Sequence, residues 1–161
     1  MALVLKADSV VGDSNITDHV GWIDVSSANI SSHTPVTIAG GGMSADVPSL
    51  SDLSVTTVSG KHSPDFWKKH LSGKHFDKVE LEDLIISGAA APVKSQKTTL
   101  TEVYITMYGG GASTGGGDRG FETITFQYGT IEFEWFTQDA QGAVKSVGSQ
   151  KYDNKAKKVL T

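Results

Sequence analysis

The residues Thr123 to Trp135, TITFQYGTIEFEW, alternate apolar and polar side chains in two consecutive runs. The apolar positions are Ile124, Phe126 and Tyr128 in the first run and Ile131, Phe133 and Trp135 in the second. Side chains alternate between the two faces of a strand, so the change of phase at Gly129 indicates a bulge or a sharp bend there. Such bends let a sheet wrap into a barrel or cross between packed sheets.

Five other segments have the same period of two and predict half-buried strands of an antiparallel sheet. They lie within residues 2–14, 19–32, 47–60, 78–87 and 99–108. In the fourth of them, the alternation places Val79 and Leu81 on the buried face and Glu80 and Glu82 on the wet face. Residues 137–146 predict a hairpin turn into a last strand. The pattern as a whole indicates a mainly β domain.

One segment, SPDFWKKHLSG (residues 63–73), predicts a single helix instead. Ser63 suits the N-cap, and Pro64 suits the first helical position, where its missing N–H costs nothing. Gly73 suits a C-terminal stop. Trp67 and Leu71 are four residues apart, so we expect them to form the apolar seam of the helix.

The size and charge of the chain exclude several classes of function. A chain of 161 residues suits one domain, residues 1–161, and the lack of cysteine excludes disulfides and thiolate metal ligands. A net charge of −4 without a basic stripe argues against nucleic acid as a partner. No segment approaches the roughly 20 apolar residues of a membrane span, so membrane insertion is not predicted.

The N-terminus bears on where the protein acts. It lacks the basic and apolar regions of a cleavable signal peptide. We therefore expect the protein to begin in the cytoplasm, and export by a route that does not read a signal peptide remains open.

A glycine-rich tract at residues 109–120, GGGASTGGGDRG, contains two patterns found in enzymes. Residues 111–115 read G-x-S-x-G, but Ser113 would be a nucleophile only if a helix followed it directly. Residues 115–120 read G-x-G-x-x-G, which also needs a following helix to hold a phosphate. A strand is predicted after the tract instead, so we interpret the tract as a connection.

Two further sets of side chains are candidates for a metal site or a catalytic site. His62, His70 and His75 surround the predicted helix, but their spacing does not place them on one helical face, which favours surface histidines over a metal site. Glu132 and Glu134 would lie about 7 Å apart on one strand face, a separation that could suit glycoside chemistry. Alternating glutamates are also what a wetted strand face requires. We therefore predict no catalytic, metal or cofactor-binding site, and no cofactor.

Three segments, in their order and at their intervals, resemble the haemolysin-coregulated proteins (Hcp) of type VI secretion systems. They read GDSNITDHVGWIDV (residues 12–25), SVTTVSGKHSPDFWKKHLSGKHF (54–76) and GGGASTGGGDRGFETITFQYGTIEFEW (109–135). The resemblance covers nearly the whole chain. It implies a mainly β fold: an antiparallel β-barrel of two packed sheets with one short α-helix on its side.

The resemblance also implies a function as a structural subunit. Six copies would form a ring, and rings would stack into the hollow inner tube that a contractile sheath drives out of the cell. The lumen would hold small effector proteins. The implied partners are other copies of the chain, the spike protein of the same system, the sheath and the effectors, and the protein itself would be secreted.

Two loops would serve assembly under this resemblance. Residues 31–49 read as a loop too flexible to pack and too long for a tight hairpin, and they match an extended loop that reaches neighbouring subunits and rings. The second loop is the glycine-rich tract, whose end matches the family by motif. The residues assigned to assembly are Gly40, Gly41, Gly42, Met43, Asp118 and Arg119.

Other functions stay open at the level of sequence. The ring could act as a chaperone or carrier for exported effectors without forming a tube, or the chain could be the tail-tube protein of a phage-like particle. A small hydrolase using Ser113 or the glutamate pair is a third possibility. It requires that Ser113→Ala or Glu134→Gln abolish a turnover, whereas we expect neither change to affect any activity.

Overall fold

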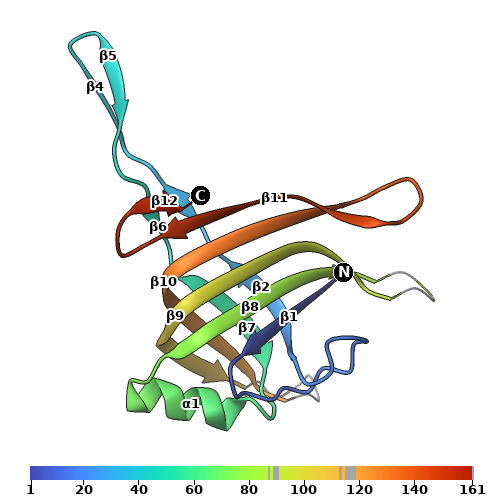
Figure 1. Ribbon diagram of the computed structural model, residues 1–161. Coiled ribbons are helices and arrows are strands. Elements are labelled where there is room, and N and C mark those ends of the chain that lie inside the picture. The colour runs from blue at the N-terminus through green and yellow to red at the C-terminus, as the bar shows by residue number, and fades with distance from the viewer. Residues whose placement is uncertain (87, 89–90, 113, 115–118, 161) are drawn as a thin grey trace.

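The computed structural model describes residues 1–86, 88, 91–112, 114 and 119–160. Within these residues the chain is mainly β, as predicted, with one helix (Figure 1). The strands are β1 (Ala2–Ala7), β2 (Ile23–Asn29), β3 (Ser32–His33), β4 (Val36–Ala39), β5 (Gly42–Ala45), β6 (Ser49–Leu50), β7 (Leu53–Val58), β8 (Phe76–Ile85), β9 (Val93–Gly111), β10 (Phe121–Gln138), β11 (Val144–Asp153) and β12 (Lys158–Leu160). The helix, α1, spans Ser63–Ser72.

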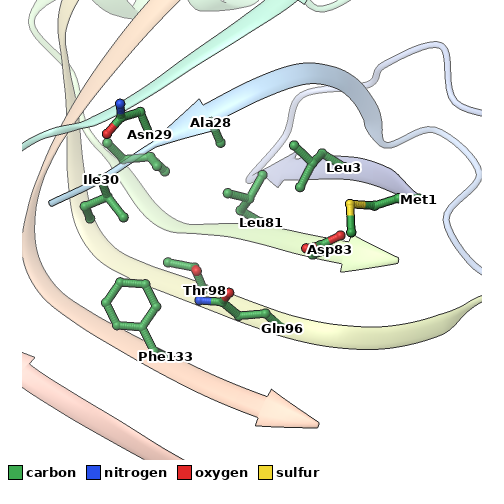
Figure 2. A pocket seen from close by; sticks show the side chains of 11 residues that line it. Met1, Leu3, Ala28, Asn29, Ile30, Leu81, Asp83, Gln96, Thr98 and Phe133 are labelled. Carbon is green, nitrogen blue, oxygen red and sulfur yellow. The ribbon is translucent and has the colours of Figure 1, made fainter. Parts of the chain in front are cut away.

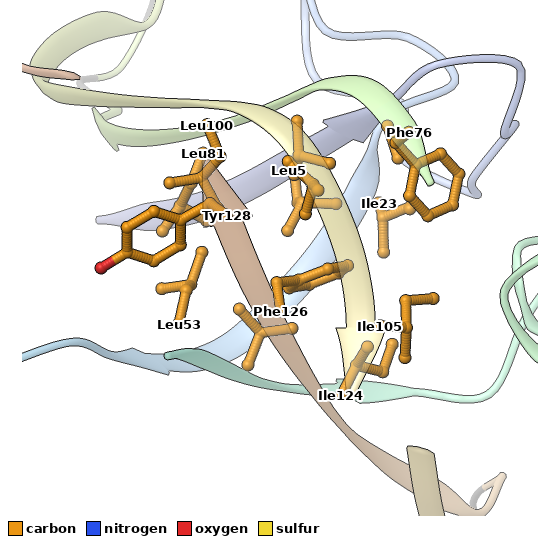
Figure 3. Packing of buried hydrophobic residues seen from close by; sticks show 14 of the residues in the cluster. Leu5, Ile23, Leu53, Phe76, Leu81, Leu100, Ile105, Ile124, Phe126 and Tyr128 are labelled. Carbon is orange, nitrogen blue, oxygen red and sulfur yellow. The ribbon is translucent and has the colours of Figure 1, made fainter. Parts of the chain in front are cut away.

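Six strands close into a barrel because β10 pairs with a strand on each side. Around the barrel the order is β10, β7, β2, β1, β8 and β9, and all pairings are antiparallel. The helix packs against β9, so the predicted barrel with one short helix is confirmed. Large apolar side chains fill the interior (Figure 3), among them Leu5, Ile23, Leu53, Phe76, Leu100, Ile124 and Phe126.

The pattern of burial changes phase at Gly129 as predicted, whereas the pairing of β9 with β10 continues in register there and shifts instead between Thr125 and Phe126. Tyr128 and Ile131 are both buried although three positions separate them. The partner strand bends at the same place, since Glu102, which faces Gly129, has a φ of 54°. A Cβ on Gly129 would lie 3.3 Å from Glu102 Cβ, closer than an ordinary contact, so glycine lets the two strands approach closely.

The bend also changes the partner of β10 and opens one end of the barrel. Up to Phe126, β10 pairs with β7, but from Thr130 onward it pairs with β11 on that side. Strands β2 and β10 therefore have no strand between them beyond Leu53, the first residue of β7. Leu53 and Leu81 of the core line a cavity at this end of the barrel.

The helix begins one residue earlier than predicted and turns a different face to the core. His62 is the N-cap, Pro64 lies in the first turn, and Gly73 ends the helix with a φ of 66°. The prediction that Trp67 and Leu71 form the buried seam is wrong, because both are exposed. Phe66 is the buried residue.

The reason for this rotation is aromatic packing. Phe66 meets the rings of Phe76 and Phe126 edge-to-face in the core, at centroid distances of 5.8 and 6.0 Å. Trp67 lies beside Tyr108 at the surface, at a centroid distance of 5.0 Å. The core ring sets the phase of the helix, and Trp67 covers the side of β9.

The prediction that Glu82 lies on a wet face is also wrong. Glu82 is 2% exposed, because the segment between β1 and β2 places His19 against it. The His19 Nε2 lies 2.6 Å from Glu82 Oε2, and the Lys94 Nζ lies 3.0 Å from Oε1. Charged and polar groups thus satisfy a carboxylate that the alternation places outside the core.

Candidate assembly surface

Within residues 31–49, predicted as a long flexible loop, residues 36–45 form a tight β-hairpin that projects from the barrel (Figure 1). Strands β4 and β5 pair from Val36–Ala45 to Ala39–Gly42, which leaves only Gly40 and Gly41 in the turn. Both glycines have positive φ, 61° and 78°, as a type I′ turn requires. The prediction of a loop too long for a tight hairpin is wrong, because the glycine pair permits the two-residue turn.

The hairpin has one apolar and one polar face. Residues opposite each other in an antiparallel pair project from the same face. The pairs Val36–Ala45 and Ile38–Met43 therefore form an apolar face, and Thr37–Ser44 lies on the other. Every residue of the two strands is exposed, with Ile38 at 73% and Met43 at 72%. The described part of the chain leaves this apolar face uncovered.

The base of the hairpin is held to the barrel. Strands β3 and β6 pair beneath it, and the Ser31 N–H donates to Ser51 Oγ over 2.8 Å. The hydroxyl of Tyr128, beside the bend in β10, donates to the Ser51 carbonyl oxygen over 2.8 Å. The predicted residues Gly40, Gly41, Gly42 and Met43 thus lie at the tip of a ribbon with an anchored base.

The second predicted loop is described only in part. Asp118 lies outside the described residues. Arg119 precedes β10, and its Nη1 lies 3.8 Å from Asp13 Oδ2. Asp13 also accepts a hydrogen bond from the Lys61 N–H at 3.1 Å, which holds the pKa of this carboxyl below its usual value. Arg119 therefore lies where residues 8–22 meet the start of the helix.

A buried histidine–glutamate pair lies close by. His62, expected at the surface, is 2% exposed, and its Nε2 donates to Glu122 Oε2 over 3.2 Å. Burial lowers the pKa of His62 below 6.5 despite the carboxylate. Burial alone would raise the pKa of Glu122, but hydrogen bonds from Tyr108, Ser63 and Ser59 lower it overall. The expectation of surface histidines is thus wrong for His62, because the start of the helix turns its ring inward.

The side chains weighed for catalysis do not come together in the described residues. Ser113 lies outside them. Glu132 and Glu134 stand on β10 between strands that carry lysines: Lys151 faces Glu132 from β11, and Lys97 faces Glu134 from β9. The Lys97 Nζ lies 3.4 Å from Glu80 Oε1 and 3.8 Å from Glu82 Oε1, so its ion pairs are with β8. Half-exposed glutamates on one strand face are what a wetted sheet requires, and this accounts for Glu132 and Glu134 without chemistry.

The described residues contain no group of three or more histidine, cysteine, aspartate or glutamate side chains placed to hold a metal ion. Nor do they include a helix with the length and apolar character needed to cross a membrane.

The open end of the barrel forms a cavity of about 260 Å³, which we call the barrel mouth (Figure 2). Its apolar lining comes mainly from Leu3, Ala28, Ile30, Leu81 and Phe133. Beside it lies a second, largely apolar cavity of about 280 Å³ that shares Ile30 and Phe133 and reaches the base of the hairpin. Sequence reasoning missed the mouth, since it arises where β10 leaves β7.

A β-barrel that carries an exposed apolar hairpin is typical of proteins that assemble with other protein chains. Residues 4–135 match the family described as "Type VI secretion system effector, Hcp". This chain belongs to the Hcp family.

Individual relatives agree. The chain is 32% identical over 103 residues to protein hcp1 of Pseudomonas aeruginosa, a match that covers 64% of this chain and spans only 62% of that protein's length. It is similar to a solved structure of a type six secretion system protein, with a TM-score of 0.90, 26% identity and 99% coverage of both chains. It also resembles Hcp1 from Salmonella typhimurium, with a TM-score of 0.76, 26% identity and coverage of 99% and 98%.

Proposed function

We propose that this protein is a structural subunit of the type VI secretion inner tube. Six copies form a ring, the rings stack into a hollow tube, and the tube leaves the cell with small effectors in its lumen. The observation that carries the proposal is the similarity to a type six secretion system protein over 99% of both chains. The subunit is not an enzyme and works without a cofactor.

The described surface supports a role in assembly. Residues 34–45 contain no charged residue in a chain that is 20% charged, and three large apolar side chains of this segment are more than half exposed. Exposed apolar patches of this kind usually mark contacts with other proteins. The glycine tip and Met43 are proposed contact residues, as is Arg119, together with the undescribed Asp118. The sheath, the spike protein and the effectors are the other partners.

The protein would be made in the cytoplasm and exported by the secretion system. Deletion of its gene should then block secretion of every substrate of the system. Loss of one effector alone would instead favour a ring-shaped carrier.

Native mass spectrometry and electron microscopy of the purified protein test the proposal directly. Native mass spectrometry should give a mass of six subunits, and negative-stain images should show rings that stack into tubes as concentration rises. Monomers across a broad concentration range would contradict it, whereas rings that never stack would favour the carrier function. A tail-tube protein of a phage-like particle would also form rings, and the genes encoded beside it would distinguish the two.

A further inference from the structure

The apolar face of the hairpin is exposed to solvent, and no described residue of its own chain covers it. An isolated two-stranded hairpin is marginally stable in water and needs a third layer against its apolar face. That face consists of Val36, Ile38, Met43 and Ala45, and all four are exposed. A hairpin with one apolar and one polar face is stabilised when another surface packs against the apolar face.

The barrel mouth presents the complementary surface. Its half-buried apolar side chains, such as Leu3, Ile30 and Phe133, pack against the core on one side and line the cavity on the other (Figure 2). Cavities that bind small ligands usually measure about 300–1,000 Å³. The mouth, at about 260 Å³, is smaller and better suited to a few side chains.

We infer that the hairpin of one copy inserts its apolar face, led by Ile38 and Met43, into the barrel mouth of a second copy. This inference rests on the proposed function and specifies which surface receives the hairpin. The projection and the cavity lie on different surfaces of one chain, so the contact is heterologous and repeats from copy to copy. Such a contact closes into a ring or continues along a stack.

Polar groups are complementary as well. In the mouth, Asp83 Oδ1 is buried and has no hydrogen-bond partner in the described residues. The hairpin tip consists of Gly40 and Gly41, and no atom lies within 4 Å of where a side chain would stand on either. Their backbone N–H groups can therefore approach a carboxylate closely, as glycine-rich turns do, once the Asp83 side chain turns its covered oxygen toward the opening. The strands β4 and β5 and the turn between them contain no charged residue, so they bring no second negative charge to Asp83.

Other exposed apolar residues make poorer acceptors. Trp67 and Leu71 stand on the convex surface of the helix, and Val147 stands on β11, a strand exposed along most of its length. The mouth is concave and adjoins a second, largely apolar cavity. The hairpin needs such a surface, since packing contacts require atoms on several sides.

Disulfide trapping tests the contact, because the chain has no cysteine of its own. One copy would carry Met43→Cys and a differently tagged copy Gln96→Cys, at the lining of the mouth. Oxidation should give a mixed dimer on a non-reducing gel, since a disulfide requires Cα atoms within about 4.4–6.8 Å. Two controls should give none: Ser44→Cys, on the polar face, with Gln96→Cys, and Met43→Cys with Val147→Cys.

A second comparison does not depend on cross-linking. Ile38→Asp places a charge on the buried side of the contact and should weaken self-association at least about tenfold. Thr37→Asp places the same charge on the polar face and should have little effect. Both variants keep the barrel intact, because β4 and β5 pair only with each other.

The outcomes separate this inference from the proposed function. Six-subunit rings without the mixed dimer, and with Ile38→Asp no weaker than Thr37→Asp, would overturn the inference and leave the tube function standing. A mixed dimer from a protein that never forms rings would establish the contact and contradict the tube function.

Discussion

The hydroxyl of Tyr128 donates to the carbonyl oxygen of Ser51 over 2.8 Å and thereby ties the bend in β10 to the base of the projecting hairpin. Tyr128 is 4% exposed and belongs to the core cluster, and its burial raises its pKa to about 12. A single side chain thus connects the barrel interior with the segment that carries the assembly surface.

Tyr128→Phe should lower the free energy of unfolding by about 1 kcal/mol, because it keeps the ring and removes one hydrogen bond. Urea denaturation followed by circular dichroism measures this change. Tyr104→Phe is the matched control, since that side chain is 44% exposed, and it should change stability by less than about 0.5 kcal/mol. Equal losses in the two variants would show that the Tyr128–Ser51 contact contributes nothing.

The buried His62 should make stability depend on pH below neutrality. Its pKa is lowered in the folded state, mainly by burial, so the unfolded chain takes up a proton first as pH falls below about 6.5. Stability should therefore decrease as pH drops from 7 to 5, by at most about 1.4 kcal/mol per pH unit for one proton. Glu122 contributes in a lower window, since its lowered pKa removes stability only below about 4.5.

Denaturation curves of His62→Gln and wild type between pH 5 and 7 isolate this effect. The glutamine can still donate to Glu122 but does not titrate, so the part of the slope due to His62 should disappear. His33→Gln, at an exposed position on β3, should keep the wild-type slope. An unchanged slope in His62→Gln would mean that protonation of this residue does not limit stability.

Local patterns in the sequence explain why much of the barrel could be predicted. The alternation around Gly129 indicated the bend, and Ser63, Pro64 and Gly73 placed the helix within one residue of its observed start. The hairpin could also have been predicted, because two glycines between short alternating runs are a signal for a type I′ turn. The glycine-rich composition of residues 31–49 also suits a flexible loop, but the glycine pair is the more specific signal.

The errors share a physical cause, which is contact between distant parts of the chain. The alternation of apolar and polar residues places Glu82 on the solvent-facing side of its strand, yet His19, 63 positions away, buries it. Glu122 is buried by His62, 60 positions away. The barrel mouth likewise depends on where β10 leaves β7. Such contacts leave no trace in local periodicity, so neither the buried pairs nor the mouth could be read from the sequence.

The close approach of residues 8–22 to the barrel depends on Gly12. A Cβ at this position would lie 2.2 Å from the Trp22 carbonyl oxygen and 2.7 Å from Ile23 Cγ1. Trp22 directly precedes β2 and Ile23 begins it, so relief of this clash would require movement of the backbone. Gly12→Ala should therefore destabilise the protein by about 3 kcal/mol.

The matched control for Gly12→Ala is Gly109→Ala in β9, where no atom lies within 4 Å of the added Cβ. It should change stability by no more than about 0.5 kcal/mol. Thermal and urea denaturation of both variants make the comparison. A Gly12→Ala variant as stable as wild type would refute the close packing of residues 8–22.

Deletion of residues 34–45, with Pro48 and the base of the hairpin retained, should separate folding from assembly. The segment contains β4 and β5, which pair only with each other, and the Tyr128–Ser51 hydrogen bond lies outside it. The barrel should therefore keep its β circular-dichroism spectrum and its unfolding free energy within about 1 kcal/mol. Self-association, measured by native mass spectrometry across a concentration series, should fall sharply because the uncovered apolar face is gone. Loss of the β spectrum would show instead that the hairpin stabilises the barrel, and unchanged oligomers would show that assembly uses another surface.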